Sequence, residues 1–181
     1  VYQVDPFGNR QAEQMTLGSS GGFWESFAYD VRNKAEPHFF VTEDQKKGAL
    51  RRFTPDPSHI DWDNDPWKML HGEGTIVNLM LHPADEAATH GTYSWTEDLS
   101  AAEANTKLYY PESEGIDVFE NELFLVIKRR KELVTLNLDD MTFTKKSTVS
   151  GIFDGMPDQM ARILGNSEDF LYFTEEVQKV L

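Results

Sequence analysis

The sequence predicts an all-β protein built from β-propeller-like blades, and three observations lead to this prediction. Short apolar runs of strand length alternate with turn residues along most of the chain. One order of residues recurs: an acidic residue at a strand start, a hairpin, then a further strand. The period of this recurrence is about 44 residues, which is typical of a propeller blade of several strands. A β-sandwich or an open meander is the alternative.

The elements follow in order along the chain. Residues 1–22 are polar and glycine-rich and are expected to form an irregular lead-in, with the propeller-like domain over residues 23–181. A single convincing helix is expected near 100–109, capped by Asp98 or Ser100 and ended by Pro111. Met156–Leu164 is expected to be a second short helix or a turn. The expected strands are Phe39–Thr42, Ile76–Leu81, Thr92–Thr96, Leu123–Ile127, Leu133–Leu138 and Leu171–Thr174.

The repeats set the number of blades. Glu114 and Asp158 are 44 residues apart, and Glu25 precedes Glu114 by 89, close to twice that spacing. A further unit is therefore expected between them, with Ile76–Leu81 as its first strand, which makes about three and a half blades. Propellers close with about 4–8 blades. The ring is thus expected to be incomplete, and a protein partner or a further chain segment would complete it.

Composition excludes several classes of function. The 31 acidic and 17 basic residues give a formal net charge of −14, which argues against nucleic acid or an anionic membrane as the main partner. No apolar run approaches the ~20 residues of a membrane-spanning helix. The absence of cysteine excludes disulfides, Cys-based zinc sites and a cysteine nucleophile. The chain begins at Val1 without a signal-peptide pattern, so either a removed leader or a segment of a longer protein is expected.

Several motifs resemble those of one family. They are Glu25-Ser-Phe-Ala-Tyr-Asp with Phe40-Val-Thr-Glu-Asp and Gly48-Ala-Leu-Arg-Arg-Phe-Thr-Pro55, then Tyr110-Pro-Glu-Ser-Glu-Gly-Ile-Asp117, then Ser147-Thr-Val-Ser-Gly-Ile-Phe-Asp-Gly-Met-Pro-Asp-Gln159. In this order and spacing they resemble the PhoX-type alkaline phosphatase superfamily, from about Gly22 to Leu181. The resemblance implies a β-propeller with a calcium-dependent, partly iron-dependent phosphatase site on its axis. It also implies a phosphorylated small molecule as substrate and an extracytoplasmic or organelle-lumen location. The PhoX site includes a cysteine ligand, which this chain lacks.

The candidate metal ligands are Glu25, Glu114 and Asp158. In a propeller, the starts of the inner strands face the central channel, so these carboxylates would converge and would need a cation, for which Ca²⁺ with its oxygen ligands is the first candidate. Glu25 and Glu114 also match metal-holding glutamates by the resemblance, and Asp158 matches less closely. The alternative is that all three cap turns or meet solvent.

Other polar residues carry weaker hypotheses. Glu43 and Glu175 would be further cation ligands, although solvated strand ends are favoured. Arg51 and Arg52 would bind phosphate, and the basic residues at 128–131 are interpreted as a charged hairpin tip. The acidic loop Asp61–Asp65 lacks the glycine and glutamate of an EF-hand. No catalytic residue is assigned.

Two functions therefore stand near parity. One is a calcium-dependent phosphomonoesterase, a hydrolase. The other is a non-catalytic propeller that serves as a binding or scaffolding subunit of a larger assembly. A lactonase-like hydrolase is a third, which no residue selects. The first two differ in whether the three carboxylates share one axis with a bound ion.

Overall fold

The computed structural model describes residues 1–19, 22–162 and 170–176, and in these residues the protein is mostly β, as the sequence predicts. Nine strands form one antiparallel sheet in the order β3-β4-β5-β6-β7-β11-β10-β9-β8. Two small two-stranded sheets, β1-β2 and β12-β13, accompany it. The bounds are β1 Tyr2–Gln3, β2 Glu13–Gln14, β3 Trp24–Asp30, β4 His38–Glu43, β5 Arg51–Pro55, β6 Gly74–Pro83, β7 His90–Thr96, β8 Ser113–Phe119, β9 Glu122–Ile127, β10 Glu132–Asn137, β11 Thr142–Ser147, β12 Met156–Arg162 and β13 Leu171–Glu176, with 3₁₀ turns at Pro57–His59 and Pro66–Leu70.

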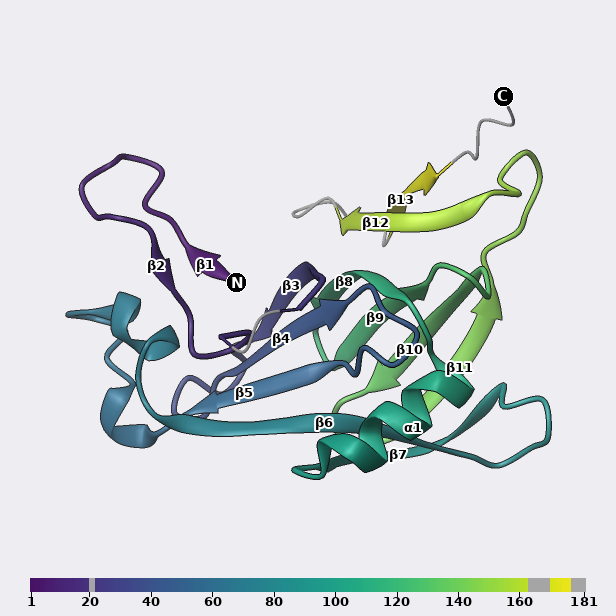
Figure 1. The fold of residues 1–181 in the computed structure, drawn as a ribbon, viewed down its shortest axis with the longest axis horizontal. Coiled ribbons are helices and arrows are strands. Elements are labelled where there is room, and N and C mark those ends of the chain that lie inside the picture. Colours follow the sequence, from purple (N-terminus) through teal and green to yellow (C-terminus); the bar gives the residue numbers. More distant parts are fainter. Residues whose placement is uncertain (20–21, 163–169, 177–181) are drawn as a thin grey trace.

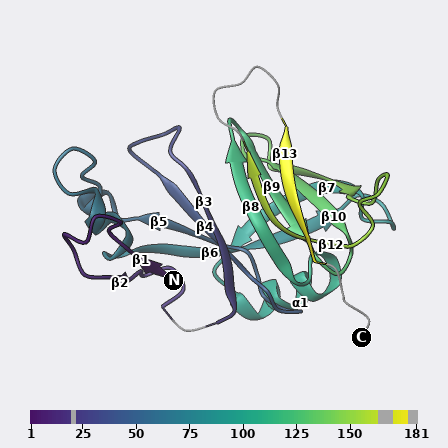
Figure 2. The same ribbon diagram turned by 90° about the horizontal axis from the view of Figure 1, so that it is seen from above.

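The large sheet bends back on itself until its two halves face each other (Figures 1 and 2). The half with β3, β4 and β5 lies opposite the half with β8, β9 and β10, while β6 and β7 join them. Alternate residues of these strands point into the space between the halves and bury its apolar surface. This main core contains Ala28, Phe40, Leu50, Leu79, Leu81, Tyr93, Tyr110, Ile116, Leu123, Leu125, Ile127, Val134, Leu136 and Phe143.

The helix predicted near 100–109 is present as α1, Leu99–Tyr109. Asp98 caps it, because its Oδ1 accepts a hydrogen bond from the backbone N–H of Ala101 at 3.0 Å. The helix packs on β6, and Tyr110 at its end is fully buried, with its hydroxyl donating to the carbonyl of Leu79 at 2.6 Å. In the described residues no helix has the length and apolar character that a bilayer crossing requires.

Three parts of the sequence interpretation change. Ile76–Leu81 does not begin a separate unit: it lies in β6, which is long enough to pair with β5 at one end and β7 at the other. Residues 1–22 contain the pair β1-β2, and Met15 and Leu17 there are buried in a second core beside β4 and β5. Met156–Leu164 was expected to be a helix or turn, but Met156–Arg162 is strand β12 because it pairs with β13; residues 163–164 lie outside the described part.

Three strands define the inner side of the molecule. β3, β8 and β12 lie side by side, although they belong to different hairpins and share no ladder of backbone hydrogen bonds (Figure 2). Each is followed by its antiparallel partner, β4, β9 or β13. Because β3 and β8 are the two edge strands of the large sheet, their contact nearly closes this sheet into an incomplete ring.

Candidate metal centre

The three inner strands share one irregularity at the same place. The pairing register shifts between Trp24 and Phe27 in β3, between Ser113 and Ile116 in β8, and between Pro157 and Met160 in β12. Each shift encloses two residues, and the first of each pair is a predicted metal ligand: Glu25, Glu114 and Asp158. Because β-bulges re-aim side chains and are enriched beside functional sites, the repeated shift gives the three carboxylates a common orientation.

Side chains of the second strands hold two of these shifts in place. The Thr42 hydroxyl oxygen accepts a hydrogen bond from the backbone N–H of Ser26 at 2.9 Å. In the β12-β13 unit, the Thr174 hydroxyl oxygen accepts from the N–H of Gln159, also at 2.9 Å. The two bulges are therefore built with the same donor position and the same acceptor residue type.

The carboxylates meet as the sequence predicts. One oxygen from each of Glu25, Glu114 and Asp158 lies within 4.8 Å of the others. Glu114 is buried, with 1% of its surface exposed, whereas Glu25 is exposed and Asp158 is partly buried. We call these three residues the carboxylate ring. Its members come from three neighbouring strands and lie far apart in sequence, so the fold itself assembles the ring.

A glycine allows β8 and β12 to approach closely enough for this. A Cβ added at Gly115 would lie 2.5 Å from the backbone nitrogen of Met160 and 2.9 Å from the carbonyl oxygen of Asp158. Across the ring, the Gln159 amide donates to Oε1 of Glu25 at 2.9 Å, and its own Oε1 accepts from the Ser26 hydroxyl at 3.2 Å. These contacts tie β12 to both neighbouring inner strands.

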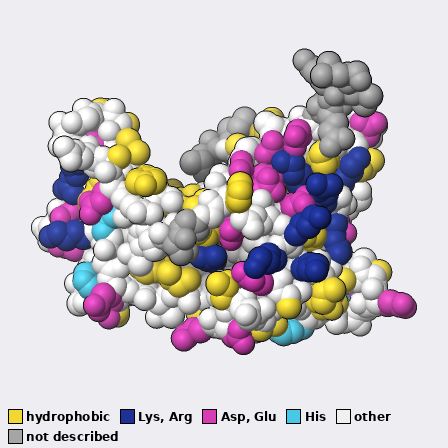
Figure 3. Space-filling view, viewed as in Figure 1, with side chains coloured by type: hydrophobic (Ala, Val, Ile, Leu, Met, Phe, Trp, Pro, Cys, Tyr) yellow, Lys and Arg dark blue, Asp and Glu magenta, His cyan; other side chains and the backbone are white. Residues whose placement is uncertain are grey.

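A second layer lies beside the carboxylate ring. The strand pairings place Asp44, Lys128 and Glu176 at equivalent positions, at or just beyond the ends of β4, β9 and β13. The Lys128 ammonium lies 2.8 Å from a carboxylate oxygen of Glu176 and 3.8 Å from one of Asp44. It also lies 2.7 Å from Oε1 of Glu114, so it links the two layers. Acidic and basic side chains intermingle over this side of the molecule (Figure 3).

The electrostatics of Glu114 and Lys128 follow from this geometry. Burial raises the pKa of Glu114 to about 7; the contact with Lys128 opposes this rise, and the charges of Asp44 and Asp158 add to it. The carboxylates around Lys128 hold its pKa above the usual range despite partial burial. Although the Glu114–Lys128 distance is short, Oε1 of Glu114 makes no aligned hydrogen bond. One lysine thus faces more negative charge than it can balance.

The donor set fits a hard divalent cation. Ca²⁺ binds oxygen ligands at 2.3–2.6 Å, so oxygens that share one ion lie roughly 3–5 Å apart, and the carboxylate ring falls in this range. Three carboxylates supply up to six oxygens if each is bidentate. A cleft of about 330 Å³ is lined by the second-layer residues Asp44, Lys128 and Glu176.

The other predicted residues lie elsewhere. Glu43 forms an ion pair with Arg51 at 3.4 Å, and Glu175 accepts hydrogen bonds from the backbone N–H groups of Asp154 and Gly155. Arg51 and Arg52 lie over different tryptophan rings, Trp24 and Trp95. Arg52 lines a cavity that contains no member of the carboxylate ring.

Lys128 is the residue that sequence reasoning misplaced. Its position among basic residues suggests a hairpin tip. In the structure, however, Lys128 directly follows β9, just as Asp44 directly follows β4, and its equivalent in the third hairpin is Glu176, the last residue of β13. Aligning the repeats residue by residue beyond the acidic start of each unit would have found it. Searches against models of protein families and against curated proteins give no match to this chain.

Proposed function

We propose that the carboxylate ring binds Ca²⁺ and that the protein is a PhoX-like β-propeller with calcium-dependent phosphomonoesterase activity. The observation that carries the calcium site is the register shift repeated in β3, β8 and β12, because three copies of one bulge bring three carboxylates within 4.8 Å. The motif resemblance supports the phosphatase activity.

Each residue of the carboxylate ring would have a different role in binding the ion. Buried Glu114 would be the fixed anchor, and Gln159 would orient the exposed Glu25 through its 2.9 Å hydrogen bond. Asp158 would complete the set from β12. The chain has no cysteine, and an all-oxygen donor set favours calcium over softer metals. When bound, Ca²⁺ would withdraw electron density from the phosphoryl oxygens of a phosphate monoester and offset the charge that develops there.

Metal analysis paired with p-nitrophenyl phosphate turnover, before and after chelation, tests this proposal. We expect stoichiometric calcium, turnover that chelation removes and calcium restores, and loss of both in Glu25→Gln and Glu114→Gln. Glu97→Gln is the matched control, because Glu97 is exposed and lies outside the carboxylate ring. A folded protein without metal and without turnover would contradict both parts of the proposal.

A non-catalytic binding or scaffolding subunit is the second candidate, and the surface of β3 favours it. β3 is an edge strand of the large sheet and exposes aromatic side chains, with Phe27 37% and Tyr29 57% exposed. Exposed aromatic residues on an unpaired strand are typical of protein-interaction surfaces. Calcium binding without turnover, together with a stable complex that Tyr29→Ser weakens, would select this candidate.

A further inference from the structure

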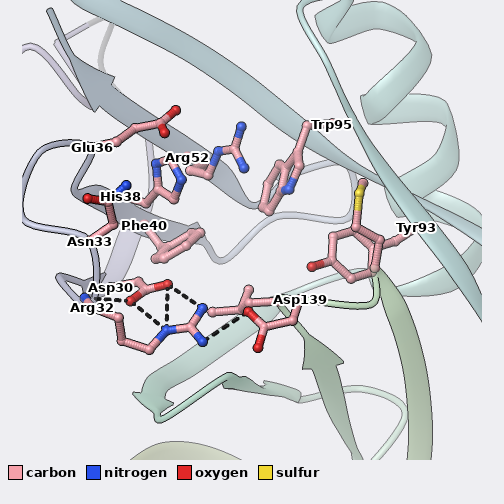
Figure 4. A pocket seen from close by; sticks show the side chains of 12 residues that line it. Asp30, Arg32, Asn33, Glu36, His38, Phe40, Arg52, Tyr93, Trp95 and Asp139 are labelled. Carbon is pink, nitrogen blue, oxygen red and sulfur yellow. Dashed lines mark hydrogen bonds and ion pairs between the residues drawn. The ribbon is translucent and has the colours of Figure 1, made fainter. Parts of the chain in front are cut away.

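A cavity of about 380 Å³ lies between the two halves of the large sheet, at the far end of β3 from the carboxylate ring. Asp30 at the end of β3 borders it, and Glu25 lies five positions earlier, roughly 16 Å away along an extended strand. In Figure 4, His38 and Arg52 from β4 and β5 line one side, and Tyr93 and Trp95 from β7 line the other. The cavity is therefore separate from the proposed calcium site.

Among the described residues that line this cavity, Arg52 is a cation without an ion pair. Its guanidinium lies 4.7 Å from the centroid of the Trp95 ring. Its Nε is buried and has no hydrogen-bond partner. Among the described residues, no carboxylate comes within ion-pair distance of it, and Glu36 influences it only from farther away. Arg32 across the cavity differs, because Asp30 at 2.9 Å and Asp139 at 3.0 Å already neutralise it.

A guanidinium without a counter-ion is costly to withdraw from water. Burial lowers the pKa of Arg52, which reflects this cost. Buried polar atoms without partners are uncommon in native proteins, and Arg52, which carries one, also lines the cavity with the rest of its side chain. An arginine that lies over an aromatic ring can still form paired hydrogen bonds with a carboxylate through the edge of its guanidinium.

We propose that this cavity binds a small organic carboxylate, a single negative charge on a flat apolar body, with Arg52 as its anchor. Arg52 has no carboxylate within ion-pair distance among the described residues and so offers a contact for one negative charge, whereas Asp30, Glu36 and Asp139 around the cavity disfavour polyanions. Phe40, Tyr93 and Trp95 supply apolar walls for the body. His38 contributes a neutral imidazole: its Nδ1 lies 2.8 Å from the Thr54 hydroxyl, and burial, with Arg52 nearby, lowers its pKa.

Benzoate is the probe, and the indole N–H signals of the four tryptophans in ¹⁵N-labelled protein report its position. We expect benzoate to shift the Trp95 signal saturably, with the signal assigned by Trp95→Phe. Arg52→Gln should weaken binding roughly tenfold to hundredfold, the range for a hydrogen-bonded charge. Arg10→Gln is the matched control, because Arg10 also lies over a tryptophan, Trp67, but has its own carboxylate partner, Asp65.

One further variant and two further ligands test the proposal independently. Arg52→Lys keeps the charge without the planar fork, so we expect intermediate binding, and this variant decides the matter if Arg52→Gln does not fold. Benzyl alcohol should not bind, and equal binding of this neutral analogue would overturn anion recognition. Binding of inorganic phosphate without benzoate would overturn the ligand class. No saturable shift with benzoate, or a shift unchanged in Arg52→Gln, would overturn the site.

Discussion

The charged side chains at the two ends of β3 are paired differently. At the Glu25 end, three ring carboxylates and two flanking acids share one lysine, Lys128. At the Asp30 end, Arg32 has two carboxylates while Arg52 has none within ion-pair distance among the described residues. The difference lies in how each end is built. Backbone bulges repeated in three strands create the first, whereas side chains from unrelated elements create the second.

A sequence repeat can encode the carboxylate ring, but it cannot encode the Arg52 cavity. The bulge recurs in β3, β8 and β12, so it places one residue from each of these strands around a common point. The Arg52 cavity depends on the large sheet bending back until β7 faces β4 and β5. The carboxylate ring should therefore be disrupted by changes to the backbone of the bulges. The Arg52 cavity should lose its ligand when a single side chain is changed.

Removing the buried ligand should have the largest effect. Glu114→Gln should weaken calcium binding by more than about a hundredfold, because even outer partners of metal ligands contribute about 10–100-fold. Calorimetric titration of wild type, Glu114→Gln and the control Glu97→Gln measures this. Unchanged affinity in Glu114→Gln would mean that calcium binds outside the carboxylate ring.

A substitution that disturbs the close approach of β8 and β12 should have the next largest effect. Gly115→Ala should lower the free energy of unfolding by about 2–3 kcal/mol, because the new methyl group meets the backbone of β12 and no rotamer can relieve that contact. Gly8→Ala, with open space but a positive φ of 72°, should cost only about 1 kcal/mol. Urea denaturation compares them. Equal losses would show that β8 and β12 are not closely packed.

Removing the internal cation should have the opposite sign. Lys128→Met should raise calcium affinity by roughly tenfold, since an ammonium 2.7 Å from Glu114 competes with the ion for a carboxylate. Lys128→Arg retains the charge and should leave affinity near that of wild type. Weaker calcium binding in Lys128→Met would show that Lys128 organises the carboxylate ring rather than competing for it.

The smallest effect concerns pH at the other end of β3. Burial and the charge of Arg52 lower the pKa of His38, against the pull of Glu36 and Asp30. The unfolded chain therefore binds the proton more readily, and this contribution to stability is lost as pH falls below about 6.5. Wild type should lose more stability than His38→Gln between pH 7.5 and 5.5. NMR titration should place the His38 pKa below 6.5, and a value above it would contradict this account.

Much of the fold followed from the sequence because strand length, turns and caps are local properties. The β-rich character, α1 and the positions of β4, β6, β7, β9, β10 and β13 come from such signals. The carboxylate ring was also predictable, because Glu25, Glu114 and Asp158 begin equivalent units and a repeat preserves position. What the pattern did not contain was the bulge, since a register shift depends on the partner strand.

The remaining features required the three-dimensional arrangement. The sequence pattern predicts that β6 begins a unit. In the structure its ten residues pair with both β5 and β7, and no local pattern in the sequence specifies these partners. In the sequence, Lys128 resembles a solvated hairpin residue. Its role becomes visible only when β9 is recognised as the equivalent of β4 and β13. Arg52 was proposed as a phosphate ligand beside Arg51, but successive residues of β5 point to opposite faces and lie over different tryptophans.

Anomalous diffraction from crystals grown with Mn²⁺, an oxygen-binding divalent ion, tests the central claim most directly. The account predicts one strong peak within bonding distance of Glu25, Glu114 and Asp158, absent from crystals of Glu114→Gln. A protein whose only bound ion lay in another acidic region, such as the Asp61–Asp65 loop, would contradict it.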